Sequence, residues 1–358
     1  KENMHDAVKR ECLAVRESLG ILDASTLGKI DLQGPDTVKF LNMIYTNAWS
    51  QLDIGSCRYG IMCNEHGMIF DDGVTTRIGE HHYHMTTTTG GAARVMSWLE
   101  EFLQTEWLDM KVFCTSVTEQ WSVLSISGPN SRAFLQDLTD INLSKESFPF
   151  MKFREGQVCG IKARVFRISF TGELSYEVNV PARYGKFVWE QFIEHGKKYN
   201  ITPYGTETMH VLRAEKGFII VGQDTDGSAT PIDMNMDWII SKKKEDFLGK
   251  RSFTRPDTIR PDRKKFVGLL VNDKKTVLPE GSHIVEKALK QPPMKMLGHV
   301  TSSYYSPTLG HPIALAMLQD GLNRMGEQVL IPLMSGKVVE ATVSDTIFYD
   351  KEGMRNNE

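Results

Sequence analysis

The sequence lacks a charge excess of either sign. Its 42 lysine and arginine residues nearly balance its 45 aspartate and glutamate residues, and the formal net charge is −3. A chain this close to neutral has no strong field for a polyanion, so sequence-independent nucleic-acid binding is not expected. The chain also lacks an uninterrupted run of about 18 apolar residues, so no membrane-spanning helix is predicted.

Cysteines are few and scattered. The five cysteines, Cys12, Cys57, Cys63, Cys114 and Cys159, are odd in number and form no Cys-x-x-Cys pair. Zinc-ribbon, iron–sulfur and disulfide-framework interpretations therefore fail, and a reducing cytoplasm fits best. Motifs of the GxGxxG, GxxxxGK and GxSxG types are also absent, which disfavours a dinucleotide site, a P-loop and a serine nucleophile.

Metal binding has little support in the sequence. His82 and His84 can place two imidazoles on one strand face, but no third ligand is suggested nearby. We therefore expect no metal site.

The 358 residues predict two or three domains in a globular chain with 41% hydrophobic residues. Up to about residue 262, short strands and helices alternate. The apolar spacing predicts helices over 2–19, 92–103, 131–138 and 183–195, and strands over 28–32, 59–63, 68–70, 74–78, 82–88, 121–126, 161–169 and 176–181. Beyond residue 262, helical periodicity almost disappears and short strands recur between turns, which is typical of a small β barrel or sandwich.

The segment from Tyr59 to Asp72 is the densest site candidate. Two apolar runs flank an Asn-Glu-His-Gly turn, so Tyr59 and Asp71 are expected near one another on paired strands. A carboxylate that follows Met68-Ile69-Phe70 is costly to desolvate and tends to be functional. The alternative is that Asp71 and Asp72 simply end a strand at the surface.

A second candidate is Glu177. It alternates with apolar neighbours along a strand, so it lies on the polar face. In a polar pocket its carboxylate would need hydrogen-bond donors, which a ligand with adjacent N–H groups, such as a pterin or a guanidine, can supply. The alternative is a solvated carboxylate that pairs with arginine or lysine.

A third candidate is a helix that carries His210, Arg213 and Glu215 and stops at Gly217. Arg213 could clamp a substrate carboxylate in bidentate fashion. Alternatively, Arg213 and Glu215 are surface charges or part of a structural ion pair.

The candidate segments occur in a familiar order, and the chain resembles the folate-binding aminomethyltransferase family typified by the glycine-cleavage T-protein. The motifs that carry the resemblance are Gly20-Ile-Leu-Asp23, Asn64-Glu-His-Gly67 with Asp71-Asp72, Thr171-Gly-Glu173 with Glu177, Leu212-Arg213, Asp246-Phe-Leu-Gly249 and Ser306-Pro-Thr-Leu-Gly310. Within the family, Thr86-Thr-Thr-Thr-Gly-Gly91 and Gly217-Phe-Ile-Ile-Val-Gly-Gln-Asp224 are most similar to the carboxyl-terminal, folate-binding half of heterotetrameric sarcosine oxidase α subunits.

The resemblance implies an α+β fold with three domains in a cloverleaf around a central folate channel. We assign residues 1–29 and 111–233 to the first α+β domain, 30–110 and 234–262 to the second, and 263–358 to a carboxyl-terminal β barrel. Because a dinucleotide-binding half precedes this region in such subunits, and because the sequence starts at a lysine, we expect a fragment or a separately encoded homologue.

The resemblance also implies the site residues. Asp71 matches the catalytic aspartate, Glu177 the carboxylate that binds the pterin ring, and Arg213 a substrate-binding arginine. Tyr59, Phe170 and Thr87 are the further folate-binding positions. Phe170 replaces the usual tyrosine of the family and Met209-His210 replaces an Arg-Asp pair, so donation by a lipoyl protein is not expected.

The implied function is capture of the methylene-iminium species from sarcosine oxidation on tetrahydrofolate, which gives 5,10-methylenetetrahydrofolate. The flavin that oxidises sarcosine would sit on a partner flavoprotein subunit. Two alternatives remain open, namely a stand-alone aminomethyltransferase or folate-dependent demethylase, and a folate-binding module without catalysis.

Overall fold

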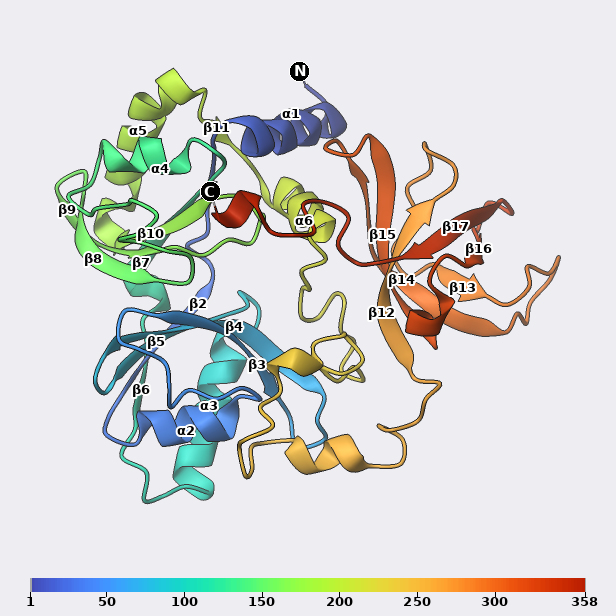
Figure 1. Cartoon of the computed structure of the whole chain (residues 1–358), viewed down its shortest axis with the longest axis horizontal. Coiled ribbons are helices and arrows are strands. Elements are labelled where there is room, and N and C mark those ends of the chain that lie inside the picture. The colour runs from blue at the N-terminus through green and yellow to red at the C-terminus, as the bar shows by residue number, and fades with distance from the viewer. Residues whose placement is uncertain (1, 358) are drawn as a thin grey trace.

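Two β-sheets and a closed β-barrel make up the structure, a computed structural model that describes residues 2–357. In Figure 1 the first sheet lies at the upper left, the second below it, and the barrel at the right. The predicted α+β class with a carboxyl-terminal barrel is confirmed.

The first sheet has six strands, and helices α4 (Ser131–Gln136) and α5 (Gly185–Gly196) cover its outer face (Figure 1). In spatial order the strands are β11 (Thr202–Pro203), β1 (Gly20–Asp23), β7 (Trp121–Ser127), β10 (Ser175–Pro181), β9 (Ile161–Phe166) and β8 (Phe153–Val158). Only the β1–β11 pair is parallel. The apolar residues of β10 pack with Phe134 and Phe192 of these helices, so the alternate positions, including Glu177, point to the opposite face.

The second sheet has five strands and packs against helices α2 (Thr37–Ile44) and α3 (Ala92–Thr105). Its spatial order is β3 (Cys57–Cys63), β4 (Ile69–Gly79), β5 (His82–Thr87), β2 (Gly28–Gln33) and β6 (Phe113–Ser116). Val95 and Leu99 of α3 are four residues apart and fully buried, the spacing of one helical face. The polar faces of both sheets are thereby left for the centre of the molecule.

The barrel closes through six strands, in the order β12 (Lys264–Val271), β15 (His311–Gln319), β14 (Met296–Ser306), β13 (His283–Val285), β16 (Gln328–Pro332) and β17 (Val338–Ser344). Ala314, Ala316 and Leu318 point into the barrel core. The alternate residues Ile313 and Leu315 belong to a separate buried cluster with residues of helices α1 (Met4–Glu17) and α6 (Thr206–Glu215). The period-two pattern of β15 therefore builds the barrel core with one face and attaches the barrel with the other.

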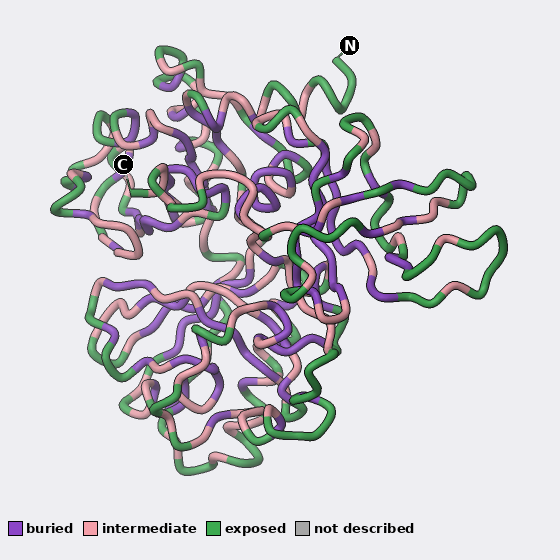
Figure 2. The backbone as a smooth tube through the Cα atoms, turned by 45° about the vertical axis from the view of Figure 1, so that its right-hand side comes forward, coloured by how far each residue is buried: buried purple, intermediate pink, exposed green. Residues whose placement is uncertain are grey.

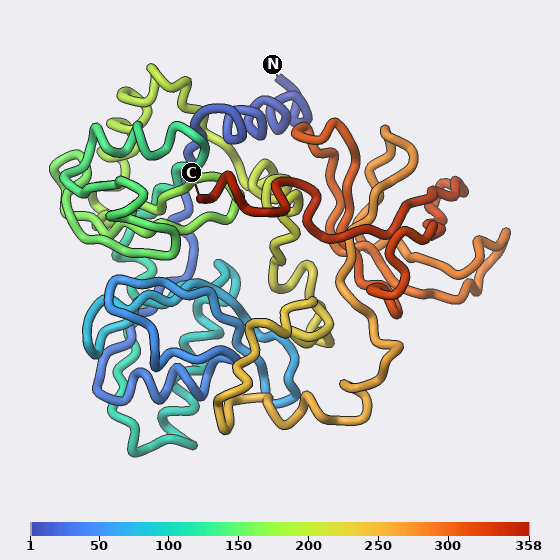
Figure 3. Tube along the Cα trace, in the orientation of Figure 1, coloured from blue at the N-terminus to red at the C-terminus, as the bar shows by residue number. Residues whose placement is uncertain are grey.

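A buried ion network joins the carboxyl-terminal segment to the first sheet and the central helices. Arg16 of α1 contacts Glu173 at 2.9 Å and Glu215 of α6 at 2.6 Å, and Arg355 reaches Glu173 at 3.1 Å. Figure 3 shows the last residues, in red, returning from the barrel to the first sheet. In Figure 2 the buried parts of the tube run through the interior of each unit and through the centre where the units meet, and the exposed parts are mainly loops at the outside.

Seven short 3₁₀-helices complete the described elements: η1 (Thr118–Gln120), η2 (Ala182–Tyr184), η3 (Lys197–Tyr199), η4 (Asp237–Ile239), η5 (Lys250–Thr254), η6 (Gly321–Arg324) and η7 (Arg355–Asn357). The five cysteines form no disulfide within residues 2–357. No helix in this range is long and apolar enough to cross a membrane.

Most predicted elements are present with shifts of one to three residues at their ends. The runs 68–70 and 74–78 form the single strand β4, and α2 was not predicted. β6 falls in the segment that we assigned to the first domain, yet it pairs with β2 in the second sheet. The division into three domains stays a prediction.

Candidate functional site

A cavity of about 1910 Å³ lies where the sheets, α6 and the barrel meet. Its lining residues extend along the chain from Leu22 to Asn356 and include parts of both sheets, of α6 and of β12. Pockets for drug-sized molecules have volumes of roughly 300–1000 Å³, so this cavity has room for an extended ligand together with a second small molecule.

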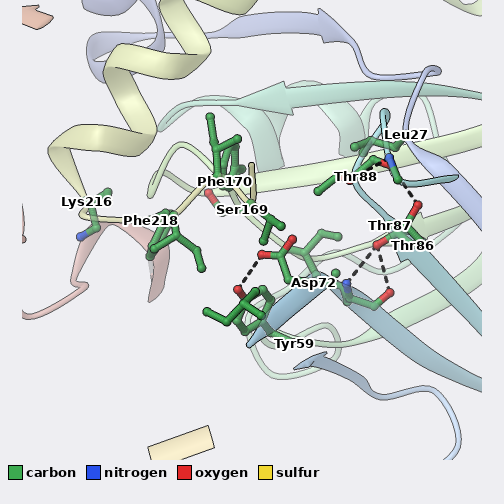
Figure 4. A pocket seen from close by; sticks show the side chains of 18 of the residues that line it. Leu27, Tyr59, Asp72, Thr86, Thr87, Thr88, Ser169, Phe170, Lys216 and Phe218 are labelled. Atoms are coloured by element: carbon green, nitrogen blue, oxygen red, sulfur yellow. Dashed lines mark hydrogen bonds between the residues drawn. The ribbon is translucent and has the colours of Figure 1, made fainter. Parts of the chain in front are cut away.

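Asp72 and Tyr59 form a hydrogen-bonded pair on the cavity wall. The Tyr59 hydroxyl donates to Asp72 Oδ2 at 2.6 Å, and both side chains line the cavity (Figure 4). Burial raises the pKa of Asp72 to about 7, although the hydrogen bond from Tyr59 opposes this shift. Burial also raises the pKa of Tyr59 well above its usual value, so the phenol stays a donor. Asp72 can therefore hold or release a proton near neutral pH.

Asp71 is enclosed on the other side of the strand. Its side chain is fully buried and does not belong to the cavity lining. Oδ1 accepts from the backbone N–H groups of Asp72 and Thr88, at 2.9 and 3.0 Å, and Oδ2 accepts from the Thr88 hydroxyl at 2.9 Å. All three donors belong to the protein, so Asp71 presents its oxygens to Thr88 and Asp72 and not to the cavity.

The placement of Asp71 follows from the alternation of side chains along β4. Neighbouring residues of a strand point to opposite faces, so only one of two adjacent aspartates can face the cavity. Met62 pairs with Asp71 and Cys63 pairs with Ile69, which leaves Phe70 as an extra residue in a β-bulge. Beyond the bulge, the residues of β4 that face the cavity are shifted by one position relative to a regular strand. The sequence gives no signal for this bulge.

Glu177 of β10 also lines the cavity. Burial raises its pKa to about 7, and the charge of Lys29 only partly offsets this effect. Within residues 2–357 no side chain or backbone N–H group donates a hydrogen bond to its carboxylate. A half-buried carboxylate without protein donors is a ready acceptor for a ligand that brings adjacent N–H groups. The pterin ring of a folate has such groups, so the donor and acceptor chemistry fits.

Phe170 and Thr87 also lie on the cavity wall, and their folate-binding role stays a prediction. The ring of Phe170 stacks on that of Phe218 with centroids 6.2 Å apart, and Figure 4 shows both rings near Lys216. The Thr87 hydroxyl donates to the carbonyl of Thr88 at 2.9 Å, so it is used within the protein. These residues shape the wall, whereas Asp72 and Glu177 place carboxyl groups with raised pKa values on it.

Arg213 does not belong to the cavity lining. Its guanidinium is fully buried, contacts Asp224 at 2.5 Å, and donates to Ser302 Oγ at 2.7 Å. The structural ion pair that the sequence left open is therefore present, with Asp224 and not Glu215 as the partner of Arg213. A carboxylate substrate has no access to this group.

The structure adds residues that the sequence analysis did not place in the site. Thr346, Ile347 and Asn356 of the carboxyl-terminal segment contribute to the cavity wall. His210, on the helix named above as the third candidate, lines the cavity from α6. Burial and the nearby Arg213 lower the pKa of His210, so its imidazole is neutral at pH 7. No sequence signal connects residues beyond 345 to this site, because only the fold brings them back to the centre.

The two histidines of β5 have a common partner. His82 Nε2 and His84 Nδ1 lie 2.9 and 2.6 Å from the carboxylate of Asp31 on β2. Among the described residues, no cluster of three or more histidine, cysteine, aspartate or glutamate side chains is arranged to hold a metal ion.

Comparison with protein-family models gives two matches. Residues 1–244 match the GCVT N-terminal domain, and residues 264–350 match the glycine cleavage T-protein C-terminal barrel domain. Together they cover both sheets and most of the barrel.

The chain is similar in sequence to proteins named sarcosine oxidase subunit alpha and to proteins named aminomethyltransferase. The chain is 52% identical over 360 residues to sarcosine oxidase subunit alpha of Corynebacterium sp. (strain P-1), an alignment that covers 99% of this chain and 37% of that protein. It is 28% identical over 345 residues to the aminomethyltransferase of Thermotoga maritima, with 96% of this chain and 90% of that protein covered. The chain thus spans little more than a third of the oxidase subunit.

A solved structure shares the fold. The crystal structure of glycine cleavage system aminomethyltransferase T from Bartonella henselae superposes with a TM-score of 0.84 at 24% sequence identity, and 96% of this chain and 90% of that chain are covered.

Proposed function

The chain belongs to the glycine-cleavage T-protein family, and from this premise we propose that it binds tetrahydrofolate in the central cavity and catalyses one-carbon transfer there. When bound, tetrahydrofolate supplies amine nitrogens that accept a carbon unit. The single observation that carries the proposal is the pair of cavity carboxylates, Asp72 and Glu177, each with a pKa raised to about 7 by burial. Perturbed carboxylates that share one cavity are typical of binding and catalytic sites.

We assign the binding role to Glu177. Its carboxylate lines the cavity on β10 and receives no hydrogen bond within residues 2–357, so its burial is unfavourable until a ligand donates to it. A planar ring with two neighbouring N–H groups satisfies both oxygens. Phe170 and Phe218 add apolar surface to the same wall.

We assign the chemical role to Asp72 and not to Asp71. Asp72 lines the cavity and can exchange a proton near neutral pH, whereas Asp71 is enclosed. Bond formation at an amine nitrogen releases a proton, and a carboxylate with a pKa near the working pH is suited to take it up. While ionised, Asp72 also stabilises a cationic carbon donor electrostatically. Tyr59 holds the carboxylate in place through its hydrogen bond.

We propose sarcosine as the origin of the carbon unit. This finer assignment is supported by the 52% identity to the protein named sarcosine oxidase subunit alpha. Oxidation of the N-methyl group by two electrons gives a methylene-iminium species, and the electrons would pass to a flavin on a partner flavoprotein subunit. Transfer of the methylene carbon to tetrahydrofolate breaks its bond to the amine nitrogen, releases glycine as the free amine together with a proton, and gives 5,10-methylenetetrahydrofolate. Enclosure of the reaction in a cavity limits the competing release of formaldehyde.

The test has two stages. Calorimetric titration with tetrahydrofolate should give saturable binding to this chain. In a reconstituted sarcosine-oxidising complex, Asp72→Asn should lower the yield of 5,10-methylenetetrahydrofolate by about 10²–10⁴-fold, the usual effect of losing a general base, while free formaldehyde rises. The matched control is Asp53→Asn, a change outside the cavity. Unchanged methylene transfer in the Asp72 variant would refute the assignment.

A stand-alone aminomethyltransferase is the second candidate function. The observation that favours it is the alignment with aminomethyltransferases, which covers 90% of their length. Turnover of an aminomethyl-lipoyl donor by this chain without any partner would support this function. Dependence of product formation on a flavoprotein would support the first one.

A further inference from the structure

We propose that Asp71 is a positioning residue, which fixes the segment Thr86–Gly91 as a wall of the cavity and thereby sets the fit of the ligand beside Asp72. This inference rests on the proposed function. It gives the fully buried carboxylate a role that requires no contact with the ligand.

The wall segment needs an external anchor. β5 ends at Thr87 and α3 begins at Ala92, so the residues between them are outside the ladder and the helix. All of Thr86–Gly91 line the cavity. In Figure 4, Thr86, Thr87 and Thr88 lie on the same side of the site as Leu27.

Asp71 supplies this anchor from the neighbouring strand β4. Its two oxygens accept from the backbone N–H and the hydroxyl of Thr88, at 3.0 and 2.9 Å. The Thr88 hydroxyl in turn accepts from the N–H of Gly91 at 3.0 Å. One carboxylate therefore orders the turn through a continuous chain of hydrogen bonds that ends at the start of α3.

Gly91 is shaped to this contact. A Cβ atom added at Gly91 would lie 1.8 Å from Asp71 Oδ2 and 2.6 Å from the Thr88 hydroxyl oxygen. The backbone conformation of Gly91, with φ −86°, is accessible to other residues. The need for glycine is therefore the close approach of the carboxylate and not backbone strain.

The same geometry separates the tasks of two consecutive aspartates. Asp72 lines the cavity and carries a titratable proton, whereas Asp71 is fully buried and saturated by protein donors, with Arg94 Nη2 3.5 Å from Oδ2. Because the two residues are adjacent on one strand, the position of the wall is tied directly to that of the reactive carboxylate.

The experiment compares tetrahydrofolate binding to this chain and its variants by calorimetry from pH 6 to 9, with the thermal midpoint of each ligand-free protein as a check on folding. Thr88→Val removes the hydroxyl that Asp71 accepts, and Thr88→Ser retains it. Asp71→Asn replaces an acceptor oxygen with a donor. Gly91→Ala is measured alone and together with Asp71→Ala, which vacates the space that the new methyl group needs.

We expect Thr88→Val and Asp71→Asn to raise the Kd about tenfold, less than the loss of a charged hydrogen bond made directly to the ligand, because the lost bond acts through the wall segment. The pH profile of binding should be unchanged in Thr88→Val and should move to lower pH in Asp71→Asn, because the charge of Asp71 raises the pKa of Asp72. Thr88→Ser should bind as the wild type does. Gly91→Ala should weaken binding in the wild-type background and have no added effect beside Asp71→Ala.

Three results would overturn the inference. They are an unaltered Kd in Thr88→Val, a disappearance of the ionisation instead of its shift to lower pH in Asp71→Asn, or equal weakening by Thr88→Ser and Thr88→Val. If Asp71→Asn does not fold, the two Thr88 variants decide alone. Failure of the wild-type chain to bind tetrahydrofolate would refute the proposed function, which is a separate outcome.

Discussion

Replacement of Glu177 by glutamine should affect ligand binding and protein stability in opposite directions. The carboxylate has a pKa raised from 4.5 to about 7 because burial disfavours its charge. At 1.36 kcal/mol per pH unit, this difference corresponds to roughly 3 kcal/mol of unfavourable free energy in the ligand-free protein above pH 7. Glu177→Gln has no charge to bury, so it removes this cost.

The direction of the stability change depends on how the pKa of Glu177 differs between the folded and the unfolded state. A carboxyl group whose pKa is higher in the folded state than in the unfolded state makes folding less favourable as the pH rises from 4.5 to about 7. The stabilisation by Glu177→Gln should therefore be largest at pH 8.5, at most about 3 kcal/mol, and should vanish near pH 4.5. Binding of tetrahydrofolate should weaken instead, because glutamine presents an N–H donor where the ligand also has one. The loss of one charged hydrogen bond, about 2–3 kcal/mol, corresponds to a Kd on the order of 100-fold higher.

The assay combines thermal unfolding at pH 5 and pH 8.5 with calorimetric titration of tetrahydrofolate. Glu155→Gln on β8 is the matched control, because Glu155 is exposed and should leave both quantities unchanged. An unchanged Kd in Glu177→Gln would refute the binding role. A lower thermal midpoint at pH 8.5 would show that the carboxylate is already stabilised by the protein, which contradicts the reasoning from burial.

Three further predictions concern the cavity and its support. Tyr59→Phe removes the hydrogen bond that lowers the pKa of Asp72, so the ionisation near pH 7 in the pH–rate profile should move upward, with the acid limb shifted by about one pH unit. Arg213→Met leaves Asp224 buried without its counter-charge and should destabilise the protein by about 3–5 kcal/mol, measured by urea unfolding, whereas Arg213→Met combined with Asp224→Leu should recover most of this loss. Phe170→Tyr should leave the thermal midpoint unchanged, because the ring of Phe170 borders the cavity and has room there for a hydroxyl group. The Kd for tetrahydrofolate should change by less than about tenfold, and a larger change would contradict a purely apolar role for this position.

The barrel shows what a sequence pattern can predict. Ile313, Leu315 and Met317 alternate with alanines and a leucine, and this period of two appears in the structure as two faces of β15. Short strands with turn residues between them predicted a small barrel or a sandwich, and the family resemblance favoured the barrel. Both faces of β15 are apolar, so the sequence pattern does not show which face lies in the barrel core. The structure shows it, because the other face packs against α1 and α6.

The site was less accessible to sequence reasoning, and each difference has a physical cause. The sequence alone did not show that Asp72, and not Asp71, lines the cavity, because the bulge at Phe70 changes the phase of the strand and leaves no mark in the sequence. The partner of Arg213 is Asp224, in an irregular segment eleven positions away, where no helical or strand periodicity relates the two. Glu177 was easier to recognise, because a regular alternation along β10 placed it on the polar face.

The path of the chain between the two sheets bears on the order in which the protein can fold during synthesis. The chain leaves the first sheet at Asp23, builds the whole second sheet, and returns only at Trp121. At translation rates of ~5–20 residues per second, β1 waits roughly 5–20 s for its neighbour β7. The last wall of the cavity, near Asn356, emerges later still. Fragments that end before Asn356 lack this part of the cavity wall, so we expect them to gain less protease resistance from tetrahydrofolate than the 358-residue chain does.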